Sequence, residues 1–257
     1  MDESLLRVIT TLNRIADTSL VWPQGMLNPG GPHRRLKGHH DPISIGEDEC
    51  AAFGRLVAAL RPAHAFIIGN AFGFSSSYIA DVMQKHGGLS VISLDDHSEG
   101  DGQRAAAIAR ELALSLGLDA ILKNKRGASP ADIAKSVEEK LYDLIFIDGQ
   151  HRHPQVTRDF QGVLPYSSPQ TVVVFHDSWI AGVPQAVAEA KRAGFRCLWL
   201  PTSCEMILAT RSGERFAQLQ AIFREGTEDR GPRSRATGYL LYAQQSVAFH
   251  LGRLFAR

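Results

Sequence analysis

Short apolar segments alternate with amphipathic segments through the middle of the chain. The apolar segments, typical of buried β-strands, are AFIIGN (65–70), LSVISLD (89–95), AILKN (120–124), YDLIFID (142–148), TVVVFHD (171–177), FRCLWL (195–200) and EMILAT (205–210). Helical patterns lie between the first six, at residues 75–86, 103–116, 130–140, 154–164 and 183–193. This alternation predicts an α/β fold, a mostly parallel sheet with helices on both faces. The last two strands have a short link and are expected to pair antiparallel at one edge.

Helical additions are predicted at both ends of this unit. Residues 1–20 form an amphipathic pattern whose apolar positions are Leu5, Leu6, Val8, Ile9, Leu12 and Ile15. A segment rich in Pro, Gly and His follows, and we interpret it as a loop or a mobile cover. Ser44 and Glu47 match a capping box, which predicts a helix from about residue 46 to 60.

The C-terminal part predicts a helix over residues 212–225, a polar link, and a final helix. The apolar stripe of that last helix is Leu240, Ala243, Val247, Leu251 and Leu254. It is expected to pack on the domain or on a second subunit, so a homodimer through this helix is one expectation. We therefore divide the chain into an N-terminal helix and loop (1–45), a central domain (46–211) and a C-terminal helical extension (212–257).

Composition narrows the class of protein. The chain has 28 Lys and Arg against 27 Asp and Glu, whereas a general nucleic-acid-binding protein is usually more basic. Its three cysteines show no metal-type spacing and are expected to be buried thiols. The first residues, MDESLLRVIT, carry acids where a signal peptide carries Lys or Arg, and no apolar run is long enough to span a membrane. These features predict a soluble, cytoplasmic protein.

Ligands of open parallel sheets bind at the carboxyl ends of the strands, so the residues there are the candidates for a site. The first strand ends in the loop Gly69, Asn70, Ala71, Phe72 and Gly73, and Ser75 and Ser76 then open a helix whose amides can meet an anion. This G-x-x-x-G spacing differs from the G-x-G-x-x-G of dinucleotide-binding proteins. Asp95, or else Asp96, can accept from ribose hydroxyls after the second strand. Each feature alone also fits an ordinary turn; together they predict an adenosine-bearing ligand without a pyrophosphate.

The segments IIGNAFGFSSSYIA, SLDD, DLIFIDGQHRHPQVTRDF and VVVFHDSW, in this order, resemble class I S-adenosylmethionine-dependent methyltransferases. The resemblance is greatest to the O-methyltransferase branch with an I-D-G-x-H motif and an H-D pair, which includes sugar O-methyltransferases of macrolide pathways and cephalosporin hydroxylase-like relatives. It covers about residues 65–210 and implies a Rossmann-like sheet and methyl transfer from S-adenosyl-L-methionine to a hydroxyl of a small molecule or saccharide. One departure is Ile67, where the family often has an acid.

Asp148 and Asp177 end the fourth and fifth strands, close enough for their carboxylates to share one hard cation. The resemblance implies Mg²⁺ with Ser178 as third ligand, although the family usually has Asn or Asp there and serine is a poor ligand. Without a metal, the two carboxylates would orient the substrate or His151. His151 follows Asp148 by three residues and is the candidate base, because imidazole titrates near neutrality. The resemblance also implies that Asp148 contacts the cofactor and that Ser129, otherwise a helix N-cap before Pro130, contacts the adenine.

Other polar residues allow more than one interpretation. We expect His153 to be a structural residue just before a helix. His176 either reaches the pocket or packs, with a structural role favoured, and Asp159 is expected to form a salt bridge or serve on a helix face. The basic segment 33–41 is a solvated loop or a lid over an acidic acceptor. Two alternative functions also stay open: a nicotinamide-dependent oxidoreductase on a similar fold, and a non-catalytic binding protein that kept the methyltransferase fold.

Overall fold

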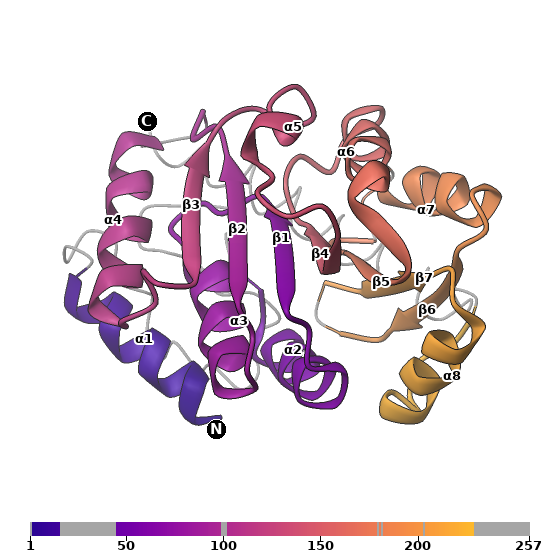
Figure 1. Cartoon of the computed structure of the whole chain (residues 1–257), viewed down its shortest axis with the longest axis horizontal. Helices are drawn as coiled ribbons and strands as arrows, with labels where there is room; N and C mark the ends of the chain where they lie inside the picture. Colours follow the sequence, from indigo (N-terminus) through magenta and orange to yellow (C-terminus); the bar gives the residue numbers. More distant parts are fainter. Residues whose placement is uncertain are drawn as a thin grey trace, which may run out of the picture.

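Seven strands form one sheet in the computed structural model, which describes residues 2–15, 45–98, 102–178, 180, 182–202 and 204–228 (Figure 1). The strands are β1 (His64–Ile68), β2 (Ser90–Asp95), β3 (Leu122–Arg126), β4 (Tyr142–Ile147), β5 (Ser167–Phe175), β6 (Arg196–Leu200) and β7 (Met206–Thr210). Their order is β3-β2-β1-β4-β5-β7-β6, and the first five run parallel. β7 lies antiparallel between β5 and β6, which confirms the predicted antiparallel pair at one edge.

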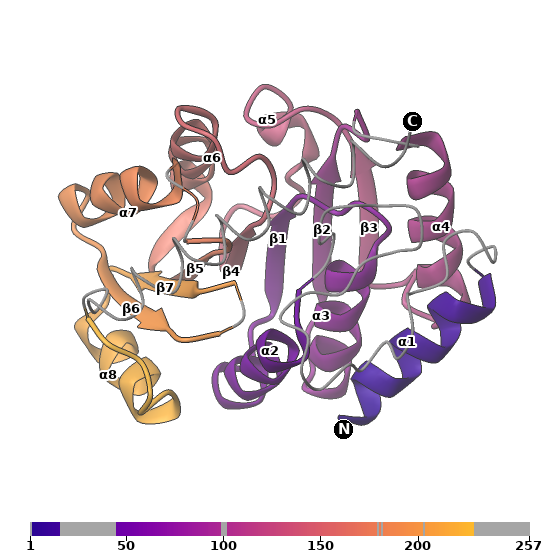
Figure 2. The ribbon, with the colours of Figure 1, turned by 180° about the vertical axis from the view of Figure 1, so that it is seen from behind.

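Helices cover both faces of the sheet, as the sequence predicts (Figure 2). One face is covered by α2 (Glu47–Leu60), α3 (Phe74–Lys85), α4 (Gly102–Ser115) and α8 (Gly213–Ile222), and α1 (Glu3–Ile15) packs on α3 and α4. The other packs against α5 (Ile133–Ser136), α6 (Gln155–Val163) and α7 (Gly182–Arg192). Alternate strand residues supply the two cores: Ile67 lies in the first and Phe66 and Ile68 in the second. Because both faces are buried, the central strands β1 and β4 are almost continuously apolar, whereas the edge strand β3 (LKNKR) is mostly polar.

Strand order reverses between β1 and β4. From β1 the chain moves outward to β2 and β3, and then returns to β4 on the other side of β1. The helices that follow β1 and β4, α3 and α6, therefore cover opposite faces, and in open parallel sheets ligands bind where such helices diverge. The loops that follow Ile68 and Ile147 meet at this point, since the Asp148 N–H donates to the carbonyl oxygen of Ile68.

Three local predictions are wrong. The cap of α2 is Gly46, whose N–H donates to the Glu49 carboxylate at 2.7 Å, so the predicted Ser44–Glu47 box is not the one used. Helix α5 is a single turn and not the predicted 130–140, because the N–H groups of residues 138 and 139 donate to the Tyr142 hydroxyl. Leu6 is 48% exposed, whereas its neighbours Leu5 and Val8 are buried.

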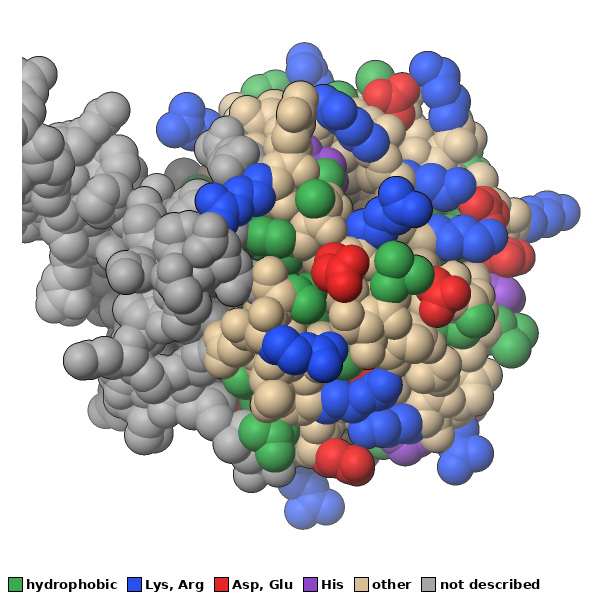
Figure 3. Space-filling view, turned by 90° about the vertical axis from the view of Figure 1, so that its left-hand side faces the viewer, with side chains coloured by type: hydrophobic (Ala, Val, Ile, Leu, Met, Phe, Trp, Pro, Cys, Tyr) green, Lys and Arg blue, Asp and Glu red, His purple; other side chains and the backbone are tan. Residues whose placement is uncertain are grey.

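The surface over α1 and α4 carries basic and acidic side chains interspersed with apolar ones (Figure 3). Among the described helices, none is both long and apolar enough to cross a membrane. The predicted basic loop 33–41 and the final apolar stripe lie outside the described residues.

Candidate active site

The loop after β1 is shaped by two glycines with positive φ. Gly69 has φ +91°, and a Cβ there would lie 2.1 Å from the carbonyl oxygen of Asp148. Gly73 has φ +81°, and its Cβ would lie 2.8 Å from Ala109 on α4. Both positions therefore require glycine for conformation and for space. The result is a tight turn that brings the backbone of residues 69–73 next to the end of β4.

Asp95, at the end of β2, lies beside this loop as predicted. Its Oδ2 accepts from the N–H groups of Asn70 (2.6 Å) and Ala71 (2.9 Å), and its Oδ1 accepts from the N–H of His97 (2.6 Å). Asp96 instead points to the surface, where it accepts from the Ser98 N–H. The carboxylate of Asp95 thus connects the carboxyl ends of β1 and β2. A ligand hydroxyl at this place would donate to the same carboxylate oxygens that accept from the backbone N–H groups.

The remaining loop side chains are mostly internal. Asn70, Phe72 and Ser75 are only 5%, 6% and 5% exposed. Asn70 donates to Asn124 of β3 at 3.1 Å and accepts from the Ser76 hydroxyl. These side chains support the loop from inside the domain, so their access to a ligand is chiefly through their backbone.

The turn after β3 contacts the start of α6. The carbonyl oxygen of Ser129 accepts from Gln155 Nε2 at 2.6 Å, and the same nitrogen donates to Asp159 Oδ1 at 2.8 Å. Ser129 is therefore no helix N-cap; α5 begins four residues later. Asp159 is fully buried, not on an exposed helix face, and burial is the main reason its pKa is raised to about 6.

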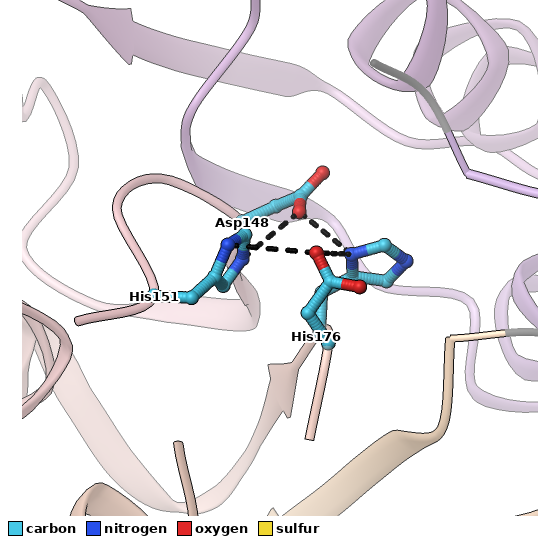
Figure 4. Close-up of side chains that lie close together, drawn as sticks. Asp148, His151 and His176 are labelled. Carbon is cyan, nitrogen blue, oxygen red and sulfur yellow. Dashed lines mark ion pairs between the residues drawn. The ribbon is translucent and has the colours of Figure 1, made fainter. Parts of the chain in front are cut away.

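Two carboxylates and two imidazoles meet at the ends of β4 and β5 (Figure 4). His176 Nδ1 lies 2.8 Å from Asp148 Oδ1 and 3.4 Å from Asp177 Oδ2. His151 reaches the same two residues, with Nε2 at 3.4 Å from Asp148 Oδ1 and Nδ1 at 3.4 Å from Asp177 Oδ2. We call these four residues the His–Asp cluster. It contains the predicted base and both predicted metal-binding carboxylates.

Mutual attraction in the His–Asp cluster outweighs the effect of burial on the ionisation of its members. Burial raises the pKa of Asp148 and of Asp177, but His176 and His151 lower both below the usual range. Burial lowers the pKa of His151, yet Asp177 and Asp148 raise it above its ordinary value. The pKa of His176 is raised further, because Asp148, Glu49 and Asp177 all face it. Both imidazoles therefore keep a proton to higher pH than free histidine does.

A second layer of residues fixes His176 from behind. Its Nε2 lies 3.0 Å from Glu49 Oε2, and Glu49 is fully buried in the first turn of α2. Ser178, the third ligand implied by the resemblance, is also fully buried, and its hydroxyl donates to Glu205 Oε2 at 3.1 Å. Ser178 is thus engaged elsewhere, and His176 takes the place next to the two carboxylates.

Sequence reasoning missed His176 and Glu49. The position of His176 directly before Asp177, at the carboxyl end of β5, is the signal that could have placed it in the site. Glu49 had no comparable signal, since 127 residues separate it from His176.

Comparison with known proteins supports the assignment of this fold. Residues 66–178 match the family model of a methyltransferase domain. An O-methyltransferase from Bacillus cereus in complex with S-adenosylhomocysteine is 17% identical, with 82% of this chain and 91% of that chain covered and a TM-score of 0.57. The O-methyltransferase TomG from Streptomyces achromogenes, involved in tomaymycin synthesis and solved with S-adenosylmethionine, is 14% identical (83% and 91% covered, TM-score 0.57). A methyltransferase from Podospora anserina bound to S-adenosylhomocysteine is 12% identical (82% and 88% covered, TM-score 0.59). No match to a curated protein was found.

At these identities the solved structures show a shared fold, and the domain match covers the central part of the chain. Residues 66–178 therefore resemble a methyltransferase domain, built on a Rossmann-like α/β fold that the solved methyltransferases share.

Proposed function

We propose that the protein transfers a methyl group from S-adenosylmethionine to a hydroxyl oxygen of a small molecule or saccharide. The observation that carries this proposal is the His–Asp cluster, whose Asp148 directly follows β4 and contacts the glycine loop through its backbone. Side chains that can accept the proton of an attacking hydroxyl therefore lie next to the loop where class I folds bind their ligand. Several of the similar structures are O-methyltransferases, which agrees with an oxygen acceptor.

The residues around the loop after β1 fit an adenosyl ligand. Gly69 and Ala71 are partly accessible, so their backbone can approach it, and Asp95 lies beside them with lone pairs directed at hydroxyl or amide donors. Ser129 and the residues before it line the neighbouring turn, where we place the adenine. When bound, S-adenosylmethionine supplies a methyl group on a positively charged sulfur. The chain's task is then to align an acceptor oxygen with that carbon, a contribution of roughly 7–11 kcal/mol in ideal cases.

The His–Asp cluster would manage the acceptor's proton. His151 has 16% of its side chain exposed, so of the two imidazoles it is the more accessible to a substrate. In the metal-free cluster, a deprotonated His151 can accept the hydroxyl proton, while Asp148 and Asp177 stabilise the resulting imidazolium. A divalent cation held by the two carboxylates would instead stabilise the alkoxide directly. Mg²⁺ is the ion that the sequence resemblance implies.

The match to a methyltransferase domain favours this function over a nicotinamide-dependent oxidoreductase. A binding protein without activity is the alternative that experiment must separate. Calorimetry with S-adenosylhomocysteine, followed by transfer of labelled methyl from S-adenosylmethionine to a panel of phenols, catechols and sugars, does so. We expect binding and transfer in the wild type, binding with greatly reduced transfer in His151→Ala, and both retained in His153→Ala. Binding without transfer to any acceptor in the panel would contradict the catalytic proposal.

A further inference from the structure

The nitrogen atoms that face the interior of the His–Asp cluster have carboxylate neighbours but no well-directed hydrogen bond. Among the described residues, His151 Nε2 and His176 Nδ1 are buried side-chain atoms without a hydrogen-bond partner. Both nevertheless lie 2.8–3.4 Å from Asp148 Oδ1. Close approach without hydrogen-bond geometry is expected when donor atoms point at a common centre and not at each other.

The spacing of these atoms matches the coordination shell of a small divalent ion. For metal–ligand bonds of about 2.1 Å, adjacent ligands stand about 3.0 Å apart in an octahedron and about 3.4 Å apart in a tetrahedron. With His151 contributing Nε2, that nitrogen lies 3.4 Å from Asp148 Oδ1, and His176 Nδ1 lies 2.8 Å from Asp148 Oδ1 and 3.4 Å from Asp177 Oδ2. The contact of His151 with Asp177, also 3.4 Å, is made by its other ring nitrogen, Nδ1, and does not belong to this set. One ligand atom from each of the four residues can be chosen so that all lie within 4.8 Å of one another.

Glu49 orients His176 for such a role. Its Oε2 accepts from the Gly46 N–H at 2.7 Å, and its Oε1 accepts from the Cys204 N–H at 3.1 Å and from the Thr202 hydroxyl at 3.2 Å. A carboxylate held by these donors is an acceptor, so the Nε2 of His176, at 3.0 Å, carries a proton toward it. The Nδ1 lone pair is then available on the cluster side. A carboxylate behind a histidine in this way both fixes the ring and raises its basicity as a ligand.

The donor set favours a different ion from the one that the resemblance implies. Mg²⁺ prefers six oxygen ligands, whereas imidazole nitrogen suits borderline ions such as Zn²⁺ and Co²⁺. We propose that Asp148, His151, His176 and Asp177 bind a borderline divalent transition-metal ion, with Zn²⁺ as the representative, and that Glu49 is the positioning residue for His176. The role of this ion at the acceptor hydroxyl rests on the proposed methyl transfer, but its binding does not.

Metal binding to chelator-treated protein tests the inference without an activity assay. We expect Zn²⁺ and Co²⁺ to bind with one-to-one stoichiometry in calorimetry, at least about tenfold more tightly than Mg²⁺. Bound Co²⁺ should show visible absorption bands that change in His151→Ala and in His176→Ala. His153→Ala, a substitution two residues from the cluster at an exposed histidine, should bind Zn²⁺ like the wild type. Glu49→Gln should weaken Zn²⁺ binding roughly 10- to 100-fold.

Three results would overturn the proposal. They are Mg²⁺ binding as tightly as Zn²⁺ to the wild type, no Zn²⁺ or Co²⁺ binding at all, and a Co²⁺ spectrum unchanged in both histidine variants. The selectivity measurement uses only wild-type protein, so it stands even if Glu49→Gln does not fold. A parallel titration with S-adenosylhomocysteine separates the two proposals. If that ligand binds and Zn²⁺ does not, the metal inference fails alone; if Zn²⁺ binds and the cofactor does not, the proposed function fails alone.

Discussion

The close contact between Gly69 and the backbone of Asp148 is required both by the fold and by the proposed site. Replacing it with alanine places a Cβ 2.1 Å from the carbonyl oxygen of Asp148, whereas ordinary contacts are 3.4–4 Å. The backbone at this position also has φ +91°, which costs an L-residue about 1–3 kcal/mol. Relief of the clash must separate the ends of β1 and β4, at about 1–3 kcal/mol for an overpacked position. We therefore expect Gly69→Ala to lower the free energy of unfolding by about 2–6 kcal/mol, the sum of these two effects.

A matched variant isolates the steric part. Gly117 also has positive φ, at +65°, but nothing lies within 4 Å of the point that a Cβ would occupy there. Gly117→Ala should therefore carry only the conformational cost, about 1–3 kcal/mol. Urea unfolding of both variants, with linear extrapolation, measures the difference. Equal or smaller destabilisation by Gly69→Ala than by Gly117→Ala would refute the close approach of β1 and β4 on which the site geometry rests.

Three further predictions concern the ionisable groups. Asp148→Asn and His151→Ala should each reduce kcat by about 10²- to 10⁴-fold, as loss of a proton acceptor does. S-adenosylhomocysteine should still bind to both variants in calorimetry. Unchanged kcat in both variants would exclude the His–Asp cluster from the chemistry. The neighbouring carboxylates raise the pKa of His151, so in chelator-treated protein kcat should rise with pH along a limb above pH 6.5, and Asp177→Asn should move that limb to lower pH. An unmoved limb in the pH–rate profile would count against His151 as the base. The pKa of Asp159 is raised from 3.8 to about 6, so the folded protein binds this proton more tightly than the unfolded chain does. Protonated Asp159 therefore stabilises the fold fully below pH 3.8, and this stabilisation is lost as the pH rises through 6. Relative to Asp159→Asn, the wild type should lose about 2.5 kcal/mol of unfolding free energy between pH 4 and pH 8, measured by urea titration, and a constant difference would disprove the shift.

The sheet could be predicted from the sequence because its signal is local. Most strands are runs of apolar residues buried on both faces, although the edge strand β3 (LKNKR) is mostly polar, and polar residues such as Asp95 and Asp148 stand at the carboxyl ends. All seven predicted strands are present, with β3 shifted by two residues. The predicted base and carboxylates meet because parallel strands bring their carboxyl ends to one edge.

What the sequence did not reveal depends on contacts between distant segments. Glu49 looks like an ordinary acid in the first turn of a helix, and only the packing of α2 against the sheet brings it to His176. His176 resembles a strand residue until its Nδ1 is seen beside Asp148. Helix α5 is short for a similar reason, since the hydroxyl of Tyr142 takes the backbone donors that would have extended it.

A crystal structure of the protein with S-adenosylhomocysteine would test most directly whether one crevice serves both the cofactor and the acceptor proton. We expect the ribose within hydrogen-bond distance of Asp95 and the sulfur facing His151 and Asp148 across a space large enough for a hydroxyl. A ligand bound away from the loop at residues 69–73, or one with its sulfur directed away from the His–Asp cluster, would contradict the account.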